Sequence, residues 1–228
     1  MTTEAQSIPP APMPPFYRRT RWAAQQLFGL WFRLRALNAE RVPPTGPVII
    51  ASNHVSFADP PMIGCAVERT VNCLARDTLF DTPGLGWLIR KLEAVPVDRQ
   101  NGGAGLKAIL DRLMAGGCVV LFPEGTRSPD GRLQAAKSGV GLTVIKSDAS
   151  VVPVRMSGAF ESYGRHRRWP RPGKVSIKFG PPLTFARLRA EAKTCPKPRL
   201  KAIYQEIADE LMAAIAKLEP SEEVAKFP

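Results

Sequence analysis

Residues 48–60 read VIIASNHVSFADP, and this stretch decides the fold. It begins with an apolar run that has the length and composition of a buried strand. A polar segment follows, and the pair Pro60-Pro61 then favours the start of a helix, because proline is accepted in the first helical turn. A buried strand that leads through a polar turn into a helix is the repeating unit of an α/β sheet.

The same alternation of apolar runs and helical patterns continues along the chain. The other apolar runs cover residues 71–75, 94–97, 119–122, 151–156 and 175–179. Helical patterns separate them at 60–67, 106–114 and 136–145, and a last amphipathic pattern runs from Leu200 to Leu218. Strands that alternate with helices form parallel sheets covered on both faces. The sequence therefore predicts an α/β fold with a mostly parallel central sheet flanked by helices, over residues 40–228.

Two segments precede this predicted domain. Residues 1–15 contain five prolines and few residues that could pack, so we expect a disordered leader. Residues 16–39 follow a helical period, with one apolar face formed by Leu27, Leu30, Trp31, Leu34 and Leu37. The uncharged part of this helix, residues 22–32, is about half the ~20 residues that a membrane-spanning helix needs.

This composition favours an amphipathic helix that lies in the membrane interface. Its arginines would face lipid phosphates; they are Arg18, Arg19, Arg21, Arg33 and Arg35. The alternative is an ordinary helix that packs its apolar face on the core. Nothing at the N-terminus resembles a secretory signal, so we expect a peripheral or monotopic protein on the cytoplasmic face of the inner (plasma) membrane.

The net charge of +12 requires an anionic partner, which could be nucleic acid or a membrane. Basic residues concentrate in the N-terminal helix and between Tyr163 and Lys174, where Trp169 also lies. No nucleic-acid motif accompanies them. We therefore predict an anionic membrane surface as a partner and no nucleic acid. The four cysteines show no paired spacing, so we expect reduced thiols and no metal site.

The first candidate site lies in the polar segment after residues 48–51. His54 and Asp59 follow the carboxyl end of the predicted strand, where sites of open α/β sheets collect. Asp59 is well placed to cap the next helix, and a turn between the two residues could fold its carboxylate onto the imidazole. An aspartate in that position fixes one histidine tautomer. The alternative is that His54 has only a structural hydrogen-bonding role.

The second candidate site follows another predicted strand, where residues 122–128 read FPEGTRS. Gly125 allows close backbone approach, and Thr126 and Ser128 offer hydroxyls. Arg127 offers a planar fork that suits phosphate. Taken alone, this segment could also be a surface turn.

The combination of N-H-x-x-x-x-D and F-P-E-G-T-R, each after a core strand, resembles the glycerophospholipid acyltransferase family. Two further stretches support the resemblance: residues 93–99, which read EAVPVDR, and residues 151–155, which read VVPVR. Lys137-Ser138-Gly139 also matches a lysine and glycine that follow the family's E-G-T-R block. The resemblance covers residues 40–185, and the best-known bacterial members of the family are 1-acyl-glycerol-3-phosphate acyltransferases.

The resemblance implies direct acyl transfer from acyl-CoA or acyl-carrier protein to 1-acyl-glycerol-3-phosphate, which would form phosphatidic acid for phospholipid biosynthesis. His54 would be the general base, and Asp59 would orient it. No cofactor is implied, since the acyl donor is a substrate. The acceptor's glycerol phosphate would bind Glu124, Gly125, Thr126 and Arg127, with Arg99 assisting; Lys137 would reach a phosphate or lie on a solvated face.

Two alternatives remain open at this point. Another lysophospholipid, such as a lyso-ornithine lipid, could be the acceptor. In a different class, the chain could be a basic membrane- or nucleic-acid-binding adaptor without catalysis. A serine hydrolase is disfavoured because no serine has G-x-S-x-G around it, and Ser56 is expected to shape its loop rather than act as a nucleophile. The sequence does not indicate an oligomeric state.

Overall fold

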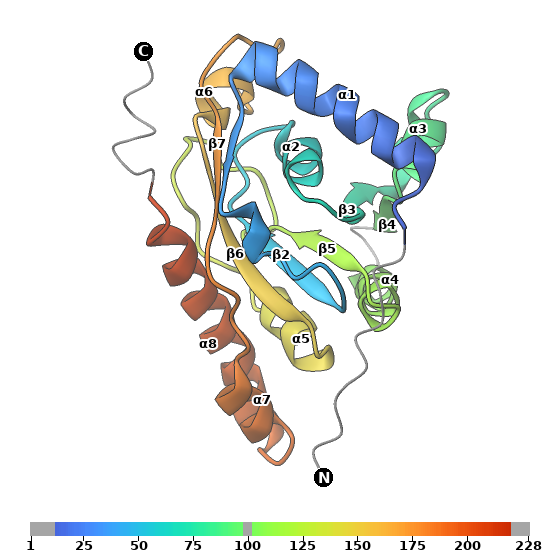
Figure 1. The fold of residues 1–228 in the computed structure, drawn as a ribbon. Helices are drawn as coiled ribbons and strands as arrows, with labels where there is room; N and C mark the ends of the chain where they lie inside the picture. Colours follow the sequence, from blue (N-terminus) through green and yellow to red (C-terminus); the bar gives the residue numbers. More distant parts are fainter. Residues whose placement is uncertain (1–11, 98–101, 220–228) are drawn as a thin grey trace.

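The computed structural model describes residues 12–97 and 102–219. Most of the predicted leader, residues 1–11, lies outside this described part. In the described residues one sheet has seven strands in the order β1-β7-β6-β2-β5-β3-β4 (Figure 1). The strands are β1 (Arg35–Leu37), β2 (Val48–Ser52), β3 (Val71–Arg76), β4 (Val95–Val97), β5 (Cys118–Leu121), β6 (Ser150–Ser157) and β7 (Ser176–Phe179).

The sheet is parallel except at one strand pair. β2 pairs with β5 and β6, and β3 pairs with β5 and β4, all in parallel. β7 runs antiparallel to β6, and β1 is parallel to β7. The predicted α/β fold with a mostly parallel sheet is therefore confirmed. Each of the six apolar runs in the sequence forms one of the strands β2 to β7.

Helices cover both faces of the sheet. They are α1 (Pro15–Phe32), α2 (Asp59–Ala66), α3 (Leu85–Lys91), α4 (Gly102–Met114), α5 (Gly139–Lys146), α6 (Ala159–Tyr163), α7 (Ala186–Ala192) and α8 (Lys197–Ala216), with short 3-10 turns η1 (Ala39–Arg41) and η2 (Asp77–Leu79). Figure 1 shows α1 and α2 on one side of the sheet and α5, α7 and α8 on the other.

Two apolar cores follow from this layering, because successive residues of a strand point to opposite faces. Val48 and Ile50 of β2 pack on the side of α1 and α2, whereas Ile49 and Ala51 pack on the side of α4, α5 and α8. All four residues are fully buried. β2 is therefore sealed on both faces, which explains why its sequence shows a continuous apolar run rather than an alternating one.

The helix predicted over residues 16–39 is too long at its carboxyl end. α1 ends at Phe32, and Arg33 takes a left-handed backbone conformation with φ of 44°. The chain then joins the sheet, because the Arg35 N–H donates to Val175 O at 3.0 Å and β1 pairs with β7. Leu34 and Leu37 therefore do not belong to the helical face that the sequence suggested.

α1 turns part of its polar side toward the protein. Arg21 Nε donates to Val67 O at 2.7 Å, and Gln25 Nε2 donates to Cys65 O at 2.9 Å. Both carbonyls lie at the carboxyl end of α2, where helical carbonyls lack intrahelical partners. The prediction that Arg21 faces lipid phosphates is therefore wrong. Its side chain instead fastens α1 to the domain.

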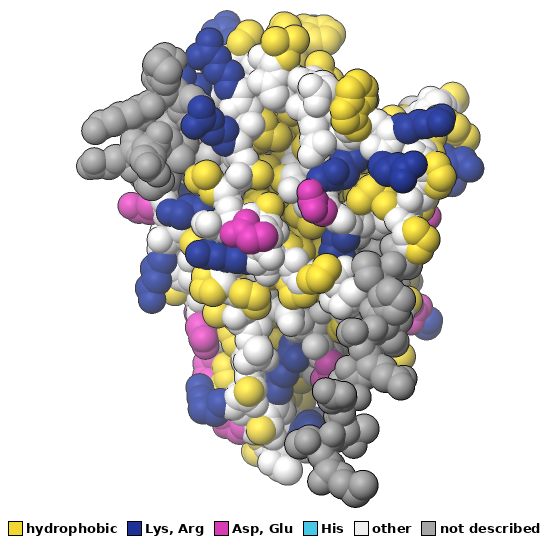
Figure 2. All heavy atoms as spheres, viewed as in Figure 1, with side chains coloured by type: hydrophobic (Ala, Val, Ile, Leu, Met, Phe, Trp, Pro, Cys, Tyr) yellow, Lys and Arg dark blue, Asp and Glu magenta, His cyan; other side chains and the backbone are white. Residues whose placement is uncertain are grey.

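The outer side of α1 is apolar. Trp22, Leu27, Leu30 and Trp31 are all exposed, and Leu30 is the most exposed at 85%. Figure 2 shows hydrophobic side chains and Lys or Arg side chains next to one another along the edge of the molecule formed by α1 and α3. Across residues 12–97 and 102–219, no helix has the length and apolar character needed to cross a membrane.

Candidate active site

The two motifs meet because their strands are neighbours. β2 and β5 are paired in a register that places Ala51 opposite Leu121, so His54 and Glu124 each lie three residues beyond a matched pair. Two hydrogen bonds join the turns that follow. The Ser128 N–H donates to His54 O at 2.7 Å, and the His54 N–H donates to Glu124 Oε1 at 3.3 Å. The main chain of His54 is thus held by the second motif.

The predicted contact between His54 and Asp59 is present. His54 Nδ1 lies 2.9 Å from Asp59 Oδ2, and the same oxygen accepts the N–H groups of Val55 at 2.7 Å and Ser56 at 2.8 Å. Asp59 is completely buried. Because a carboxylate can only accept, the proton of the neutral imidazole lies on Nδ1 in this arrangement and Nε2 keeps a free electron pair. The imidazole remains 16% exposed.

Asp59 does not cap α2 as predicted. It is the first residue of that helix, and no side-chain hydrogen bond caps the helix. The carboxylate instead turns back toward the preceding loop, where two backbone N–H groups and the imidazole surround one oxygen. The prediction was wrong because the carboxylate accepts N–H groups three and four residues before it, at Ser56 and Val55. These bonds close the turn that precedes the helix and leave the first helical turn without a side-chain cap.

Asn53 and Ser56 both hold the loop in place, and this role was predicted for Ser56. Asn53 bridges to β6 through Nδ2 to Met156 O at 3.1 Å and through its oxygen to the Met156 N–H at 2.7 Å. Ser56 Oγ donates to Tyr163 O at 2.9 Å and accepts the Ala58 N–H. Both side chains are buried. The Ser56 hydroxyl is therefore occupied by the backbone.

Residues 124–127 form a turn beside the imidazole. Gly125 has φ of +70°, a conformation that glycine adopts without strain, and a Cβ at that position would lie 3.0 Å from Lys137 Cδ. Thr126 is exposed. The guanidinium carbon of Arg127 lies 3.5 Å from the centre of the Phe57 ring, a cation–π contact that positions the guanidinium over the aromatic face.

The other predicted site residues differ in how close they lie to this turn. Lys137 is close to the turn, because its N–H donates to Pro123 O at 2.9 Å and its stem lies over Gly125. Ser128 is buried, and its hydroxyl donates within its own loop to Arg132 O at 2.8 Å, so it does not face a ligand as suggested. Arg99 lies outside the described residues.

Two aromatic residues of the site were not predicted. The Phe122 ring stacks on His54 with a centroid distance of 3.9 Å and an angle of 18° between the planes. Phe57 lies under Arg127 and also contacts Tyr163, with ring centroids 5.3 Å apart. The available sequence signal was that each motif contains one phenylalanine. In the structure, each of these rings contacts a cationic or imidazole side chain of the other motif.

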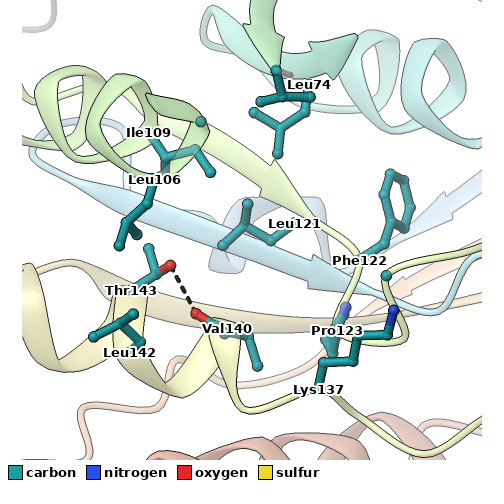
Figure 3. A pocket seen from close by; sticks show the side chains of 14 residues that line it. Leu74, Leu106, Ile109, Leu121, Phe122, Pro123, Lys137, Val140, Leu142 and Thr143 are labelled. Carbon is teal, nitrogen blue, oxygen red and sulfur yellow. Dashed lines mark hydrogen bonds between the residues drawn. The ribbon is translucent and has the colours of Figure 1, made fainter. Parts of the chain in front are cut away.

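An apolar cavity of about 380 Å³ begins beside Phe122 (Figure 3). Phe122, Pro123 and Lys137 lie at one end, next to the turn that carries Glu124. Leu106 and Thr143 lie toward the other end, and the cavity runs between α4 and α5 over β5. Its volume is within the range of roughly 300–1,000 Å³ that small-molecule sites occupy. Its lining suits a hydrocarbon chain.

The buried carboxyl of Glu124 has an unusual electrostatic environment. Burial raises the pKa of Glu124 to about 7, and this effect exceeds the opposing effects of the His54 N–H and the Arg155 guanidinium. Only Oε1 has a hydrogen-bond partner among the described residues; Oε2 is buried without one. A substantial fraction of this carboxyl is therefore protonated near neutral pH, next to the backbone N–H of His54.

Residues 33–157, more than half of the chain, match the protein family described as Acyltransferase, and the chain belongs to that family. The matched range contains all four sequence blocks on which the resemblance rests. The family prediction is therefore confirmed.

Individual relatives carry a more specific name. The chain is 26% identical to the 1-acyl-sn-glycerol-3-phosphate acyltransferase of Pseudomonas aeruginosa over 187 residues, which cover 76% of this chain and 71% of that protein. It is 29% identical to a chloroplastic protein of the same description from Arabidopsis thaliana over 141 residues, which cover 60% of this chain and 39% of that protein. The chain spans 39 to 58% of the length of three such relatives.

A solved structure supports the fold. The crystal structure of the 1-acyl-sn-glycerophosphate acyltransferase of Thermotoga maritima superimposes with a TM-score of 0.69 and 24% sequence identity, over 90% of this chain and 81% of that one.

We predict that the Glu124→Gln substitution changes how stability depends on pH. Between pH 4.5 and about 7 the folded wild-type protein keeps a proton that the unfolded chain has lost, so wild-type stability falls as the pH rises. Glutamine removes this contribution. Urea unfolding at pH 5 and pH 7.5 measures the change in the free energy of unfolding that the substitution causes at each pH. This change should be more favourable at pH 7.5 than at pH 5 by on the order of 2 kcal/mol.

The control for this measurement is Glu210→Gln, at an exposed glutamate on α8. An equal change in both variants would contradict the assignment of the pH dependence to Glu124.

Proposed function

We propose that this chain transfers a fatty acyl group from a thioester donor to the free hydroxyl of 1-acyl-glycerol-3-phosphate, producing phosphatidic acid. One observation carries the proposal: an imidazole held by a buried carboxylate lies between an arginine-bearing turn and an apolar cavity. These parts match the three chemical groups of the reaction, which are a hydroxyl to deprotonate, a phosphate to hold and a hydrocarbon chain to bury. The names of the relatives agree with this choice.

In the proposed mechanism His54 is the general base. Nε2 removes the proton of the acceptor hydroxyl while its oxygen attacks the thioester carbonyl carbon, and a carbon–oxygen bond forms. Asp59 stabilises the imidazolium that results. The tetrahedral intermediate collapses with cleavage of the carbon–sulfur bond, and the imidazolium returns its proton to the departing thiolate. No acyl-enzyme intermediate is needed, in keeping with the internal hydrogen bonds of Ser56.

The acceptor's phosphate is proposed to bind at residues 124–127. Arg127 is the main ligand, because its fork is oriented by Phe57 and can donate to two phosphate oxygens. Gly125 and Thr126 are exposed at the same turn, and the side chain of Glu124 joins this turn to the backbone N–H of His54. Lys137 contributes a second cation at the edge of the turn. Arg99 is expected to assist.

The donor is proposed to be acyl-CoA or acyl-carrier protein, whose fatty chain would lie in the cavity between α4 and α5. Phe122 connects the two regions, since its ring both stacks on His54 and lines the cavity. A chain that enters the cavity there would leave its thioester carbonyl next to the imidazole. No bound cofactor takes part in the proposed reaction.

The enzyme is proposed to act as a peripheral protein on the cytoplasmic face of the inner membrane. Trp22 and Leu30 on the outer side of α1 would enter the headgroup region, where tryptophan is favoured. Arg18 and Arg19 are exposed on the same helix and would contact lipid phosphates. α1 already packs on the core through Tyr17, Phe28 and Phe32, so its exposed tryptophans and leucines are available for the membrane.

We expect His54→Ala to lower kcat by about 10²- to 10⁴-fold, the usual contribution of a general base. An assay of acyl transfer from radiolabelled oleoyl-CoA to lysophosphatidic acid in detergent measures kcat of the variant and of the wild-type protein. The matched control is His166→Ala, which removes the only other histidine of the chain from an exposed loop. Near-normal turnover in the His54 variant, or an equal loss in the control, would show that the imidazole is not the base.

We expect Arg127→Ala to raise KM for 1-acyl-glycerol-3-phosphate by at least tenfold, because a charge-assisted bond to phosphate contributes about 1.5–3 kcal/mol. KM for the acyl donor should change little. A panel of acceptors, including lyso-ornithine lipid and lysophosphatidylcholine, tests the specificity of the wild-type enzyme. Higher kcat/KM on an acceptor without glycerol phosphate would replace the proposed substrate.

Binding to vesicles tests the proposed membrane contact. The double variant Trp22→Gln, Leu30→Gln should bind anionic vesicles at least tenfold more weakly in a sedimentation assay, because two large apolar side chains lose their burial in lipid. Met114→Gln at the end of α4 is the control, since Met114 is an equally exposed apolar residue, at 81%, on another helix. Unchanged sedimentation of the double variant would show that a different surface binds the membrane.

A further inference from the structure

A second apolar hollow lies between α1 and the loop that carries His54. It has a volume of about 280 Å³. Four of its lining residues come from the last turns of α1, between Leu27 and Phe32, and Ala58, Tyr163 and Pro170 complete it. This hollow, called the α1 groove below, shares no lining residue with the cavity between α4 and α5.

The inner end of the α1 groove leads to the reactive residues. Ala58 lines the groove and directly precedes Asp59. Tyr163 lines it as well and is tied to the same loop, because its carbonyl accepts the Ser56 hydroxyl at 2.9 Å and the Phe57 N–H at 3.4 Å. The Phe57 ring then contacts both Tyr163 and Arg127. The Phe57 ring therefore links the lining of the groove to Arg127, the proposed phosphate ligand.

The outer end of the groove belongs to the exposed side of α1. Leu27 is 59% exposed and Trp31 is 44% exposed, and both line the groove. They lie on the same helix as Trp22 and Leu30, the residues proposed to enter the membrane. The groove thus runs from an apolar surface suited to lipid to Ala58 and Tyr163, which border the loop of His54.

The exposed side of α1, the α1 groove and the neighbouring Arg127 together fit one kind of molecule. A lysophospholipid has a single hydrocarbon chain, and its anionic head lies at one end of that chain. The proposed reaction also brings two hydrocarbon chains to one imidazole, and the structure offers one apolar hollow on the Phe122 side of His54 and another on the Asp59 side. The first is lined by Lys137, and the second is lined by Tyr163, which contacts the Phe57 ring under Arg127.

We propose that the α1 groove binds the acyl chain of the lysophospholipid acceptor, so that the chain lies along α1 while its phosphate reaches Arg127 and its free hydroxyl reaches His54. The proposal rests on the proposed function and adds the site of the acceptor's chain. It also makes α1 part of the acceptor site in addition to its contact with the membrane.

Kinetics with short-chain acceptors test the proposal. Lysophosphatidic acids with chains of about four to ten carbons, used below their micelle-forming concentrations, leave water on binding, so kcat/KM should rise by up to about fourfold for each added methylene. Leu27→Gln should reduce this increment to below about twofold. The same variant should keep the wild-type dependence on the donor's chain length.

The matched control is Leu85→Gln, which changes an exposed leucine at the start of α3 that lines neither hollow. It should retain the wild-type increment. Both leucines are partly in water, so neither substitution should unfold the protein. A wild-type increment in the Leu27 variant would overturn the proposal.

Photolabelling locates the chain without relying on turnover. A lysophosphatidic acid whose chain ends in a diazirine should label residues 27–32 or the segment around Tyr163 and Pro170, and Leu27→Gln should lower that labelling. Labelling of residues 105–143 by this probe, or labelling of α1 only by a diazirine-bearing acyl-CoA, would place the donor's chain in the groove and overturn the proposal. Absence of acyl transfer with every donor and acceptor, alongside labelled α1, would instead refute the proposed function.

Discussion

Three hydrogen bonds converge on Oδ2 of Asp59, a carboxylate that is completely buried. Two backbone N–H groups close the turn after β2, and the third contact orients the imidazole of His54. A buried carboxylate needs donors, and all three of these contacts fall on one oxygen, so the turn and the orientation of the ring depend on each other. The carbonyl of His54 in this turn accepts the Ser128 N–H, and this bond positions the segment from Glu124 to Arg127. Removing this one oxygen would loosen both halves of the proposed active site.

Most of the fold could be predicted because the central strands are buried on both faces. Such strands show continuous apolar runs, and β2, β5 and β6 are clear examples. β1 could not be predicted in this way. It has three residues, its side chains are largely exposed, and its strand conformation comes from pairing with β7, which lies far away in the sequence. Sequence periodicity also extended α1 past Phe32 because Leu34 and Leu37 happen to continue the helical spacing.

The candidate site divides along a similar line. The residues of the two motifs could be located because they follow apolar strands directly, and the adjacency of β2 and β5 then brings them together. Their detailed contacts could not be deduced. The sequence does not show that Asp59 turns away from α2, that Ser128 bonds within its own loop, or that Phe57 supports Arg127. Each of these depends on the path of the backbone over three or four residues, which residue types alone leave undetermined.

The exposed apolar residues of α1 have a consequence for the protein in the absence of lipid. Arg21 and Gln25 are anchored to α2, so the helix cannot roll over to hide its apolar side without breaking two hydrogen bonds to otherwise uncapped carbonyls. In plain buffer, contact with another molecule is one way for this side to leave water. Self-association of the purified protein would then reflect the surface of one helix, and detergent that disperses such assemblies would act as a stand-in for the bilayer.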